Sequence, residues 1–235
     1  MQYNRTLAEA WRRAVDGLRG GRLDGETVIL GPQAELVADH LPGPTAGSAP
    51  AVASLGTLPV PEDATATASG LPDGAFDTAI ALGAWGSPAE VGAVLAEAVR
   101  VTRPGGSVWV GDVDARTLTR AMPATQPYGL LYRSEPSVAA DVRHRFRATP
   151  GLGVDAVRAG LRSVSTTNAD LPAAVADGVA EAVEAVRGGI WPGTELLDEM
   201  TLDRLLTHMA ASMRRSVRFP VVLTLPWSLV QGRRR

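Results

Sequence analysis

Carboxylates, histidines and aromatic residues are the side chains that could do chemistry here. The chain of 235 residues has no cysteine, and all 23 of its basic Lys+Arg residues are arginine. Without cysteine, disulfides, thiolate metal sites and cysteine catalysis are excluded. Without lysine, Schiff-base chemistry and a phosphate-loop lysine are excluded as well.

The three histidines, His40, His144 and His208, lie in separate segments and lack the close spacing of metal ligands. The sequence therefore predicts no metal site. His144 stands in the basic run DVRHRFR, which could bind an anionic substrate or an acidic partner. A solvated helix face, balanced by Asp141 and Glu135, is the interpretation that we favour.

Two acids, Asp112 and Asp114, follow an apolar run that ends at Gly111. If this run is a strand of an open α/β sheet, they lie at the edge where such sheets bind ligands. Asp114 is equally suited to cap a helix that begins at Ala115. The cap is the role that we predict for Asp114.

The charge balance argues against polyanionic partners. The formal net charge is −2 and the isoelectric point is about 5.9, so no overall positive field favours nucleic acid or acidic membranes. Charges interrupt the first twenty residues, which therefore do not resemble a signal peptide. The run FPVVLTLPWSLV is too short to span a bilayer. We expect a soluble, cytoplasmic protein with no membrane or nucleic-acid partner.

Alternating apolar patterns predict an α/β fold. A strand is expected over 27–31, with a helix from Ala34 and a second strand within 51–58. A continuously apolar strand over 78–82 then leads into a helix over 88–101, and the strand SVWVGDVD follows the turn RPGG. Strand, helix and strand in this order form a βαβ unit.

The remainder of the chain is expected to be mostly helical within a single domain, 1–235. An amphipathic N-terminal helix is expected within 1–20, and helical cap insertions at 115–160 and 173–215. A strand is expected from Leu161. The last strand is placed at Phe219 to Leu225, as a candidate edge strand because Pro220 cannot donate a hydrogen bond, and the three final arginines as a frayed tail.

The central block resembles class I S-adenosylmethionine-dependent methyltransferases. The matching residues are Leu71-Pro72, Phe76-Asp77 before the buried strand, and Arg100, Arg103, Pro104, Gly105 and Gly106 before the next strand. Ala159-Gly160-Leu161 resembles a later helix-to-strand junction of that family. The resemblance implies a doubly wound, mostly parallel, Rossmann-like sheet. In this motif Pro104 ends the helix and a glycine makes the turn, so we assign it a role in the fold, with Phe76 in the core and Asp77 at the strand entry.

The resemblance also implies S-adenosylmethionine as cofactor, bound along the first, second, third and fourth strands. The residues at those places are Gly31, Gly56, Thr67, Ala68, Leu82 and Gly83. The family places acids after the first strand, after the second and near the end of the third, but this sequence has none at these positions. Glu62 and Asp63 could reach the ribose only if the strand register differs. The cofactor pocket is therefore expected to be eroded.

Aromatic residues mark a candidate substrate pocket. Trp85 follows the buried strand, and Tyr128, Tyr132 and Trp191 lie in the predicted insertions, where the family closes its substrate pocket. They could form an apolar lid, or they could pack the helical cap on the sheet, and the sequence does not separate these alternatives.

Two functions remain open from the sequence. In the first, the protein transfers a methyl group to a small, partly apolar molecule by positioning it beside the sulfonium. In the second, it is a catalytically inactive binding or scaffolding subunit with a protein partner. An apolar face of the late helices also suggests a homo-oligomer. Its residues are Leu196, Leu197, Met200, Leu202, Leu205, Leu206, Met209 and Met213.

Overall fold

The computed structural model describes residues 25–31, 45–49, 52–55, 63–83, 88–120, 129–146 and 149–235. The predicted N-terminal helix within 1–20 and the helix from Ala34 lie outside this part of the chain. The described strands form one seven-stranded sheet with the order β2-β3-β1-β4-β5-β7-β6. They are β1 (Thr27–Leu30), β2 (Thr45–Ala49), β3 (Val52–Leu55), β4 (Phe76–Leu82), β5 (Thr102–Val113), β6 (Leu161–Ala176) and β7 (Val221–Arg234).

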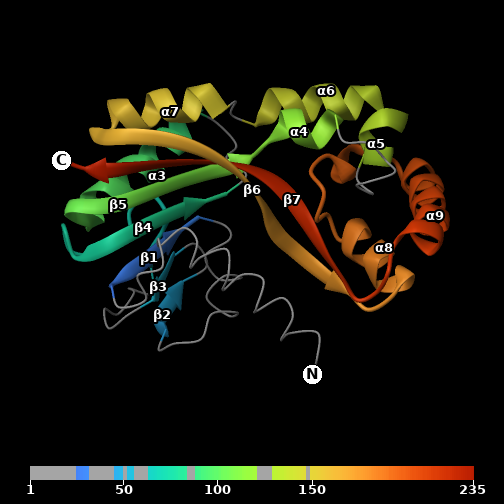
Figure 1. The fold of residues 1–235 in the computed structure, drawn as a ribbon, viewed down its shortest axis with the longest axis horizontal. Helices are drawn as coiled ribbons and strands as arrows, with labels where there is room; N and C mark the ends of the chain where they lie inside the picture. Colours follow the sequence, from blue (N-terminus) through green and yellow to red (C-terminus); the bar gives the residue numbers. More distant parts are fainter. Residues whose placement is uncertain are drawn as a thin grey trace.

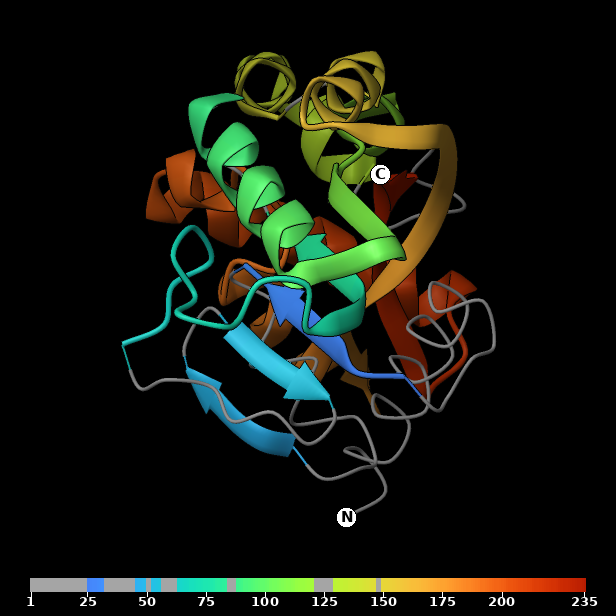
Figure 2. The ribbon, with the colours of Figure 1, turned by 90° about the vertical axis from the view of Figure 1, so that its left-hand side faces the viewer.

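The helices cover the sheet and its extension (Figures 1 and 2). Helices α3 and α7 lie on one face of the sheet. The other helices gather around the region where β6 ends and β7 begins. They are α3 (Pro88–Val101), α4 (Ala115–Arg120), α5 (Gly129–Ser134), α6 (Pro136–Arg145), α7 (Thr149–Arg158), α8 (Val179–Arg187), the short 3₁₀ helix η1 (Thr194–Leu196) and α9 (Glu199–Ser216).

The centre of the sheet confirms the predicted α/β fold. β1, β4 and β5 are parallel neighbours, and α3 connects β4 to β5. β1 and β4 are almost completely buried, and β5 is buried from Val108 to Val113, as expected for strands covered on both faces. The predicted βαβ unit is therefore present, and it fixes the common direction in which these strands end.

The half of the sheet beyond β1 differs from a doubly wound sheet. β3, which lies within the predicted second strand, runs antiparallel to β1, with Thr27 opposite Leu55 and Leu30 opposite Val52. β2 pairs antiparallel with β3. β3 therefore ends beside the start of β1, at the opposite edge from the end of β1.

The other half of the sheet carries a long ribbon that supports the cap. β7 lies between β5 and β6, antiparallel to both. Its pairing with β5 stops at Trp227, opposite Val113, but its pairing with β6 continues to Val221, opposite Ala176. The ribbon therefore extends beyond the sheet, and α4, α5, α6, α8 and α9 surround its extension, as Figure 1 shows.

Three local predictions were wrong in this half. Residues 173–176, expected to begin a helix, complete β6 because they pair in register with β7. The last strand is internal and longer than expected, since Pro220 lies just before it and Pro226 is accommodated within it. The C-terminal arginines are not frayed: β7 continues to Arg234, whose guanidinium donates to the carbonyl oxygens of Arg100 (2.8 Å) and Thr102.

Two apolar clusters build the core. One packs α3 and α7 against the sheet, and Phe76, with no exposed surface, belongs to it as predicted. The other joins the opposite side of the sheet to the cap helices through the ribbon. The first predicted insertion is thus divided, because α4, α5 and α6 belong to the cap, whereas α7 covers the sheet beside α3.

Candidate functional site

Three parallel strands end side by side at one edge of the sheet, which we call the carboxyl edge. Leu30 lies opposite Ala81, so Gly31 and Leu82 follow as neighbours, and Leu82 lies opposite Gly111. The Gly83 amide donates to the Gly111 carbonyl oxygen at 3.4 Å. Open α/β sheets bind ligands outside such strand ends.

Two glycines at this edge stand where a larger residue would be strained or would clash. Gly31, directly after β1, has a φ of 111°, a conformation that favours glycine. A Cβ on Gly111 would lie 2.5 Å from Leu229 Cδ2 and 2.8 Å from Leu82 Cδ2. Gly111 is therefore required by packing, whereas Gly31 and Gly83 stand where the two strands β1 and β4 leave the sheet.

The two acids at the end of β5 have different environments, since Asp112 lies within the strand and Asp114 follows it. Asp112 is completely buried, and its Oδ1 accepts a hydrogen bond from the Val113 amide at 2.8 Å. Asp114 caps α4, because its Oδ1 accepts from the amides of Arg116 and Thr117, both at 3.1 Å. The predicted cap is confirmed. Asp112 remains as the buried carboxylate at the described carboxyl edge.

The residues expected to hold the cofactor do not all meet at this edge. Gly31, Leu82 and Gly83 do. Gly56 lies outside the described residues, but Leu55 before it is at the opposite edge, beside Thr27. Thr67 and Ala68 lie in a turn closed by the bridge between Thr65 and Ala68, whose continuation contacts the last turns of α3.

The described residues fit an S-adenosylmethionine cofactor in part. Gly31 and Gly83 stand at the ends of β1 and β4, where such a ligand would bind, and both are buried. A carboxylate for the ribose is not supplied by the end of β3, because that strand runs toward the other edge.

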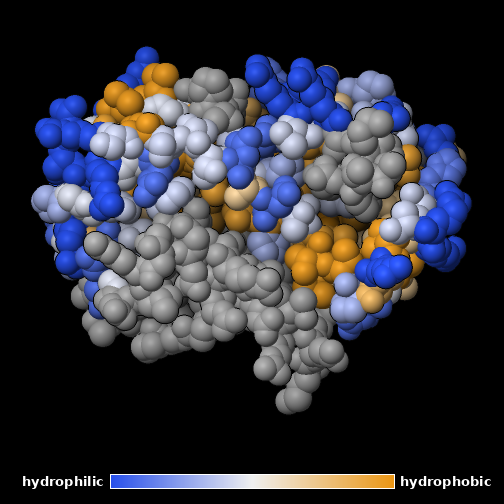
Figure 3. Space-filling view, viewed as in Figure 1, coloured by the Kyte–Doolittle hydropathy of each residue, from blue (hydrophilic) through white to orange (hydrophobic). Residues whose placement is uncertain are grey.

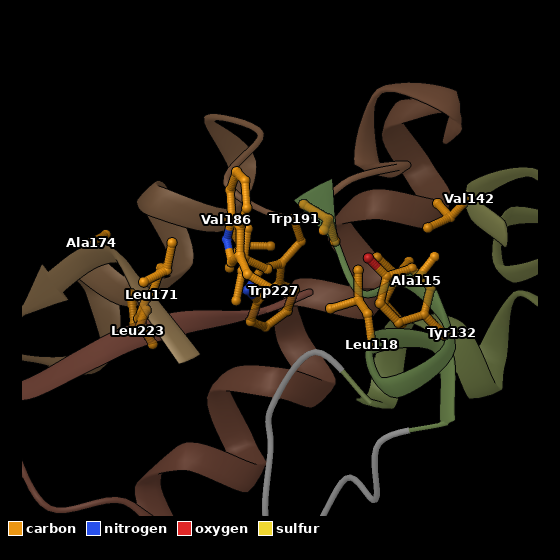
Figure 4. Packing of buried hydrophobic residues seen from close by; sticks show 14 of the residues in the cluster. Ala115, Leu118, Tyr132, Val142, Leu171, Ala174, Val186, Trp191, Leu223 and Trp227 are labelled. Carbon is orange, nitrogen blue, oxygen red and sulfur yellow. The ribbon is translucent and has the colours of Figure 1, made fainter. Parts of the chain in front are cut away.

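Two of the four aromatic candidates lie inside the cap. Tyr132 and Trp191 are 3% and 1% exposed, and the Tyr132 hydroxyl donates to the Pro192 carbonyl oxygen at 2.8 Å. Figure 4 shows Trp191 near Trp227 of the ribbon, and Tyr132 beside Leu118 of α4. Both therefore join the helices of the cap to one another and to the ribbon. Trp85 and Tyr128 lie outside the described residues.

The family-like motif lies at the opposite, amino edge, where it holds the fold together. Glu97 of α3 is 6% exposed and accepts from Arg100, from the Ser69 amide at 2.8 Å and from the Ser69 hydroxyl at 2.5 Å. Arg100 also donates to the Leu71 carbonyl oxygen at 2.8 Å and pairs with Asp73. This arrangement fixes the segment 69–73 on the end of α3.

Electrostatics confirm that this cluster is tightly coupled. Burial by itself would raise the pKa of Glu97, but the hydrogen bonds from Arg100 and Ser69 outweigh burial and lower that pKa to about 2. The hydrogen bond to Glu97 raises the pKa of Arg100. Sequence reasoning missed Glu97, although its position three residues before Arg100 on a helix was a usable signal.

The neighbouring contacts of this edge are also structural. Arg103 pairs with Asp77 at 2.9 Å, and Asp77 accepts from the Glu26 amide at 3.0 Å, which confirms a role for Asp77 at the entry of β4. Gly105, with a φ of 78°, lies within β5, where the pairing with β4 shifts register between Thr102 and Ser107, so the predicted turn is an irregular start of the strand. Among the described residues, no group of three or more potential metal ligands is found, and no helix is long and apolar enough to cross a membrane.

Comparison with known proteins supports the interpretation of the fold. Residues 49–110 match the methyltransferase domain family. A protein assigned as a methyltransferase from an antibiotic biosynthesis pathway of Anabaena variabilis is 13% identical, with a TM-score of 0.58, and the alignment covers 98% of this chain and 99% of that one. A search of curated proteins finds no match to this sequence.

Other solved structures are more distant. A protein assigned as a methyltransferase from Bacillus halodurans is 14% identical with a TM-score of 0.41, covering 89% of this chain and 92% of that chain. Phosphoethanolamine N-methyltransferase 2 of Haemonchus contortus, in complex with S-adenosyl-L-methionine, is 10% identical with a TM-score of 0.38. The alignment covers 72% of this chain but 35% of that enzyme, so the chain spans about a third of its length.

The parallel centre of the sheet and the antiparallel β7 agree with both the matched segment and the whole-chain structural similarity. The chain therefore has the fold of class I S-adenosylmethionine-dependent methyltransferases, and its residues 49–110 match the methyltransferase domain family.

Proposed function

We propose that this protein transfers a methyl group from S-adenosylmethionine to a small, partly apolar molecule at the carboxyl edge of β1, β4 and β5. The observation that supports this proposal is the adjacency of Gly31 and Gly83, where two parallel neighbouring strands leave the sheet. The cofactor would supply an electrophilic methyl group. The protein would then contribute chiefly by positioning the acceptor, for which strong acid–base chemistry is unnecessary.

The surroundings of the edge favour an apolar acceptor. Leu30, Leu82 and Val113 at the strand ends are buried, and Leu82 and Val113 belong to the same apolar cluster as the cap helices. Asp112 is the buried carboxylate nearby. An acceptor with one polar group on an apolar frame matches this composition, because small-molecule sites combine apolar walls with few polar groups.

Titration calorimetry tests this proposal. The purified protein is titrated with S-adenosylmethionine and with S-adenosylhomocysteine, and micromolar affinity is expected. Gly83→Ala should weaken binding by about tenfold or more, because a methyl group at the strand end displaces the ligand. Gly92→Ala is the matched control, since a Cβ there has no neighbour within 4 Å. No heat of binding at millimolar ligand would overturn the proposal.

A second function is favoured by the reversed strand β3. Because its end lies at the opposite edge from Gly31, the described sheet lacks the place from which a ribose carboxylate would project. This observation supports a catalytically inactive subunit that binds a protein partner through its cap. Absence of cofactor binding, combined with stable association with a second chain, is the expected result for that function.

A further inference from the structure

An open groove of ≈ 520 Å³ lies between α8 and α9 of the cap. Its middle is lined by small and apolar residues, and its two ends carry charges. The lining residues are Val179, Ala180, Val183, Glu184, Arg187, Asp203, Leu206, Thr207, Ala210 and Arg214. Figure 3 shows hydrophobic surface over α8 and the adjoining ends of β6 and β7. Nothing in the proposed methyl transfer uses this groove.

Four of the eight residues of the apolar face expected to form an interface are already buried within the chain. Leu205, Leu206, Met209 and Met213 are each less than 5% exposed, in the core between the cap helices and the ribbon. What α9 offers to another molecule is therefore a different stripe. That stripe consists of Asp203, Thr207, Ala210 and Arg214, at alternating spacings of four and three residues, and it lines the groove.

The stripe on α9 of one copy is complementary to the same stripe on a second copy whose α9 runs antiparallel to it. If two copies of α9 lie antiparallel, Asp203 of one copy can face Arg214 of the other while Thr207 faces Ala210 of the other. The two small central side chains allow the helices to approach closely. Oppositely charged residues meet at both ends, and like-charged residues would meet if the second helix were parallel.

The charges within one chain leave this pairing available. Arg187 pairs with Asp203 at 2.6 Å and lies 3.9 Å from Glu184, so this end of the groove has two carboxylates for one guanidinium. At the other end, Arg214 makes no ion pair with any residue in the described part of the chain. The ends of the groove are thus of opposite net charge, as a two-fold symmetric contact requires.

Met200 adds an apolar residue to the same stripe. It precedes Asp203 by three positions on α9 and is 80% exposed. In an antiparallel pair of α9 helices, Met200 would reach the end of the second copy's α9, near its half-buried Val217. Such a contact would cover a large exposed apolar side chain.

We propose that two copies of this chain form a symmetric dimer in which the α8–α9 grooves face each other and the α9 helices cross antiparallel. The occupant of each groove is the α9 stripe of the other copy. A two-fold contact of this kind closes on itself and produces dimers rather than filaments. The dimer does not depend on cofactor binding.

The mass of the full chain in solution tests the dimer. Multi-angle light scattering at tens of micromolar protein should give twice the chain mass of 24.5 kDa. Arg214→Glu and Thr207→Glu should each shift the protein to monomer, because they place a carboxylate against an acidic end or at the crowded centre. His208→Glu, an exposed neighbour on α9 outside the groove, should remain dimeric. A monomeric wild-type protein, or an unchanged dimer in both groove variants, would overturn the proposal.

The absence of cysteine from the sequence permits a geometric test. Thr207→Cys and Ala210→Cys chains are mixed and mildly oxidised, and a disulfide-linked heterodimer is expected because the two positions face each other across the contact. Replacing Ala210→Cys with His208→Cys should give no such product. Equal cross-linking of both mixtures would contradict the antiparallel register. Circular dichroism of each variant distinguishes loss of the dimer from loss of the fold.

Discussion

The two edges of the sheet have opposite characters. The amino edge contains charged side chains in close contact, such as Arg100 with Glu97, Arg103 with Asp77, and Arg234 with two backbone carbonyls. The carboxyl edge consists of glycines, apolar strand ends and the buried Asp112. The residues that most resemble a known family therefore maintain the fold, while the described residues of the edge expected to carry chemistry include few polar groups.

Residues that match a family's sequence motif can therefore be present for the fold alone, without carrying the family's activity. Arg100 fixes the segment 69–73 on α3, and Arg103 pairs with Asp77 of β4. These residues therefore stabilise the fold whether or not a ligand binds at the carboxyl edge.

The largest loss of stability is expected for a substitution in the cap. Trp191→Ala should reduce the free energy of unfolding by about 4 kcal/mol, since it removes a side chain that is 1% exposed from the cluster shared by cap and ribbon. Urea unfolding measures this change. Tyr132→Phe, which removes only the hydrogen bond to Pro192, should reduce it by about 1 kcal/mol. Similar losses of unfolding free energy in both variants would show that burial of the Trp191 side chain contributes no more than the Tyr132 hydrogen bond.

Removing the guanidinium of Arg100 at the amino edge should destabilise the fold nearly as much. Arg100→Met should lower the free energy of unfolding by about 3 kcal/mol, because it leaves the buried Glu97 carboxylate without its partner; the 34% exposure of the Arg100 side chain limits the loss. Arg103→Met removes a pair with both side chains more than a third exposed, so a loss under about 1 kcal/mol is expected. Denaturant titration measures both losses. Equal losses would show that burial of Glu97 does not make its pair with Arg100 more important than the exposed pair of Arg103.

The same cluster predicts how stability depends on pH. The pKa of Glu97 is lowered in the folded chain from 4.5 to about 2, so its contribution is complete above pH about 4.5 and is lost as the pH falls toward 2. The loss is on the order of 3 kcal/mol. Unfolding midpoints between pH 6 and pH 2 measure it, and Glu97→Gln should flatten the profile. Glu90→Gln, an exposed acid on the same helix, should leave the steep profile in place.

A smaller effect is expected at the turn of the amino edge. A Cβ on Gly106 would lie 2.6 Å from Thr102 Cγ2 and 2.8 Å from the Asp77 carbonyl oxygen, so Gly106→Ala should cost about 2 kcal/mol. Gly92→Ala, in open space within α3, should instead stabilise the protein by up to about 1 kcal/mol. Thermal unfolding of the two variants should therefore shift in opposite directions, and a parallel shift would mean that the turn tolerates a side chain.

Most of the central fold could be predicted from the sequence. The apolar run of β4 and the periodic apolar residues of α3 depend on neighbouring residues, so local periodicity reveals them. The cap of Asp114 is of the same kind. Residues 173–176 were misassigned because alanine-rich segments suit helix and strand alike, and their pairing with β7 lies about fifty residues away.

The candidate site could be predicted only in part. Gly31, Leu82 and Gly83 meet as expected because parallel strands end at one edge. The resemblance places Gly56 after a second strand and Thr67 near the end of a third, but β3 runs antiparallel to β1 and Thr67 lies in a turn. Strand direction depends on long-range pairing, which the residues of β3 do not reveal. The aromatic candidates were likewise ambiguous, since a lid and a core use the same side chains.

Composition and short-range patterns are enough to reveal the βαβ centre, the exclusion of lysine and cysteine chemistry, and the resemblance to methyltransferases. The folded chain is needed to show that β3 is reversed, that the arginine motif binds a buried glutamate, and that Leu205, Leu206, Met209 and Met213 of α9 are buried. These features depend on which distant segments pair and pack, and that choice is made by the whole chain when its apolar surfaces are buried together.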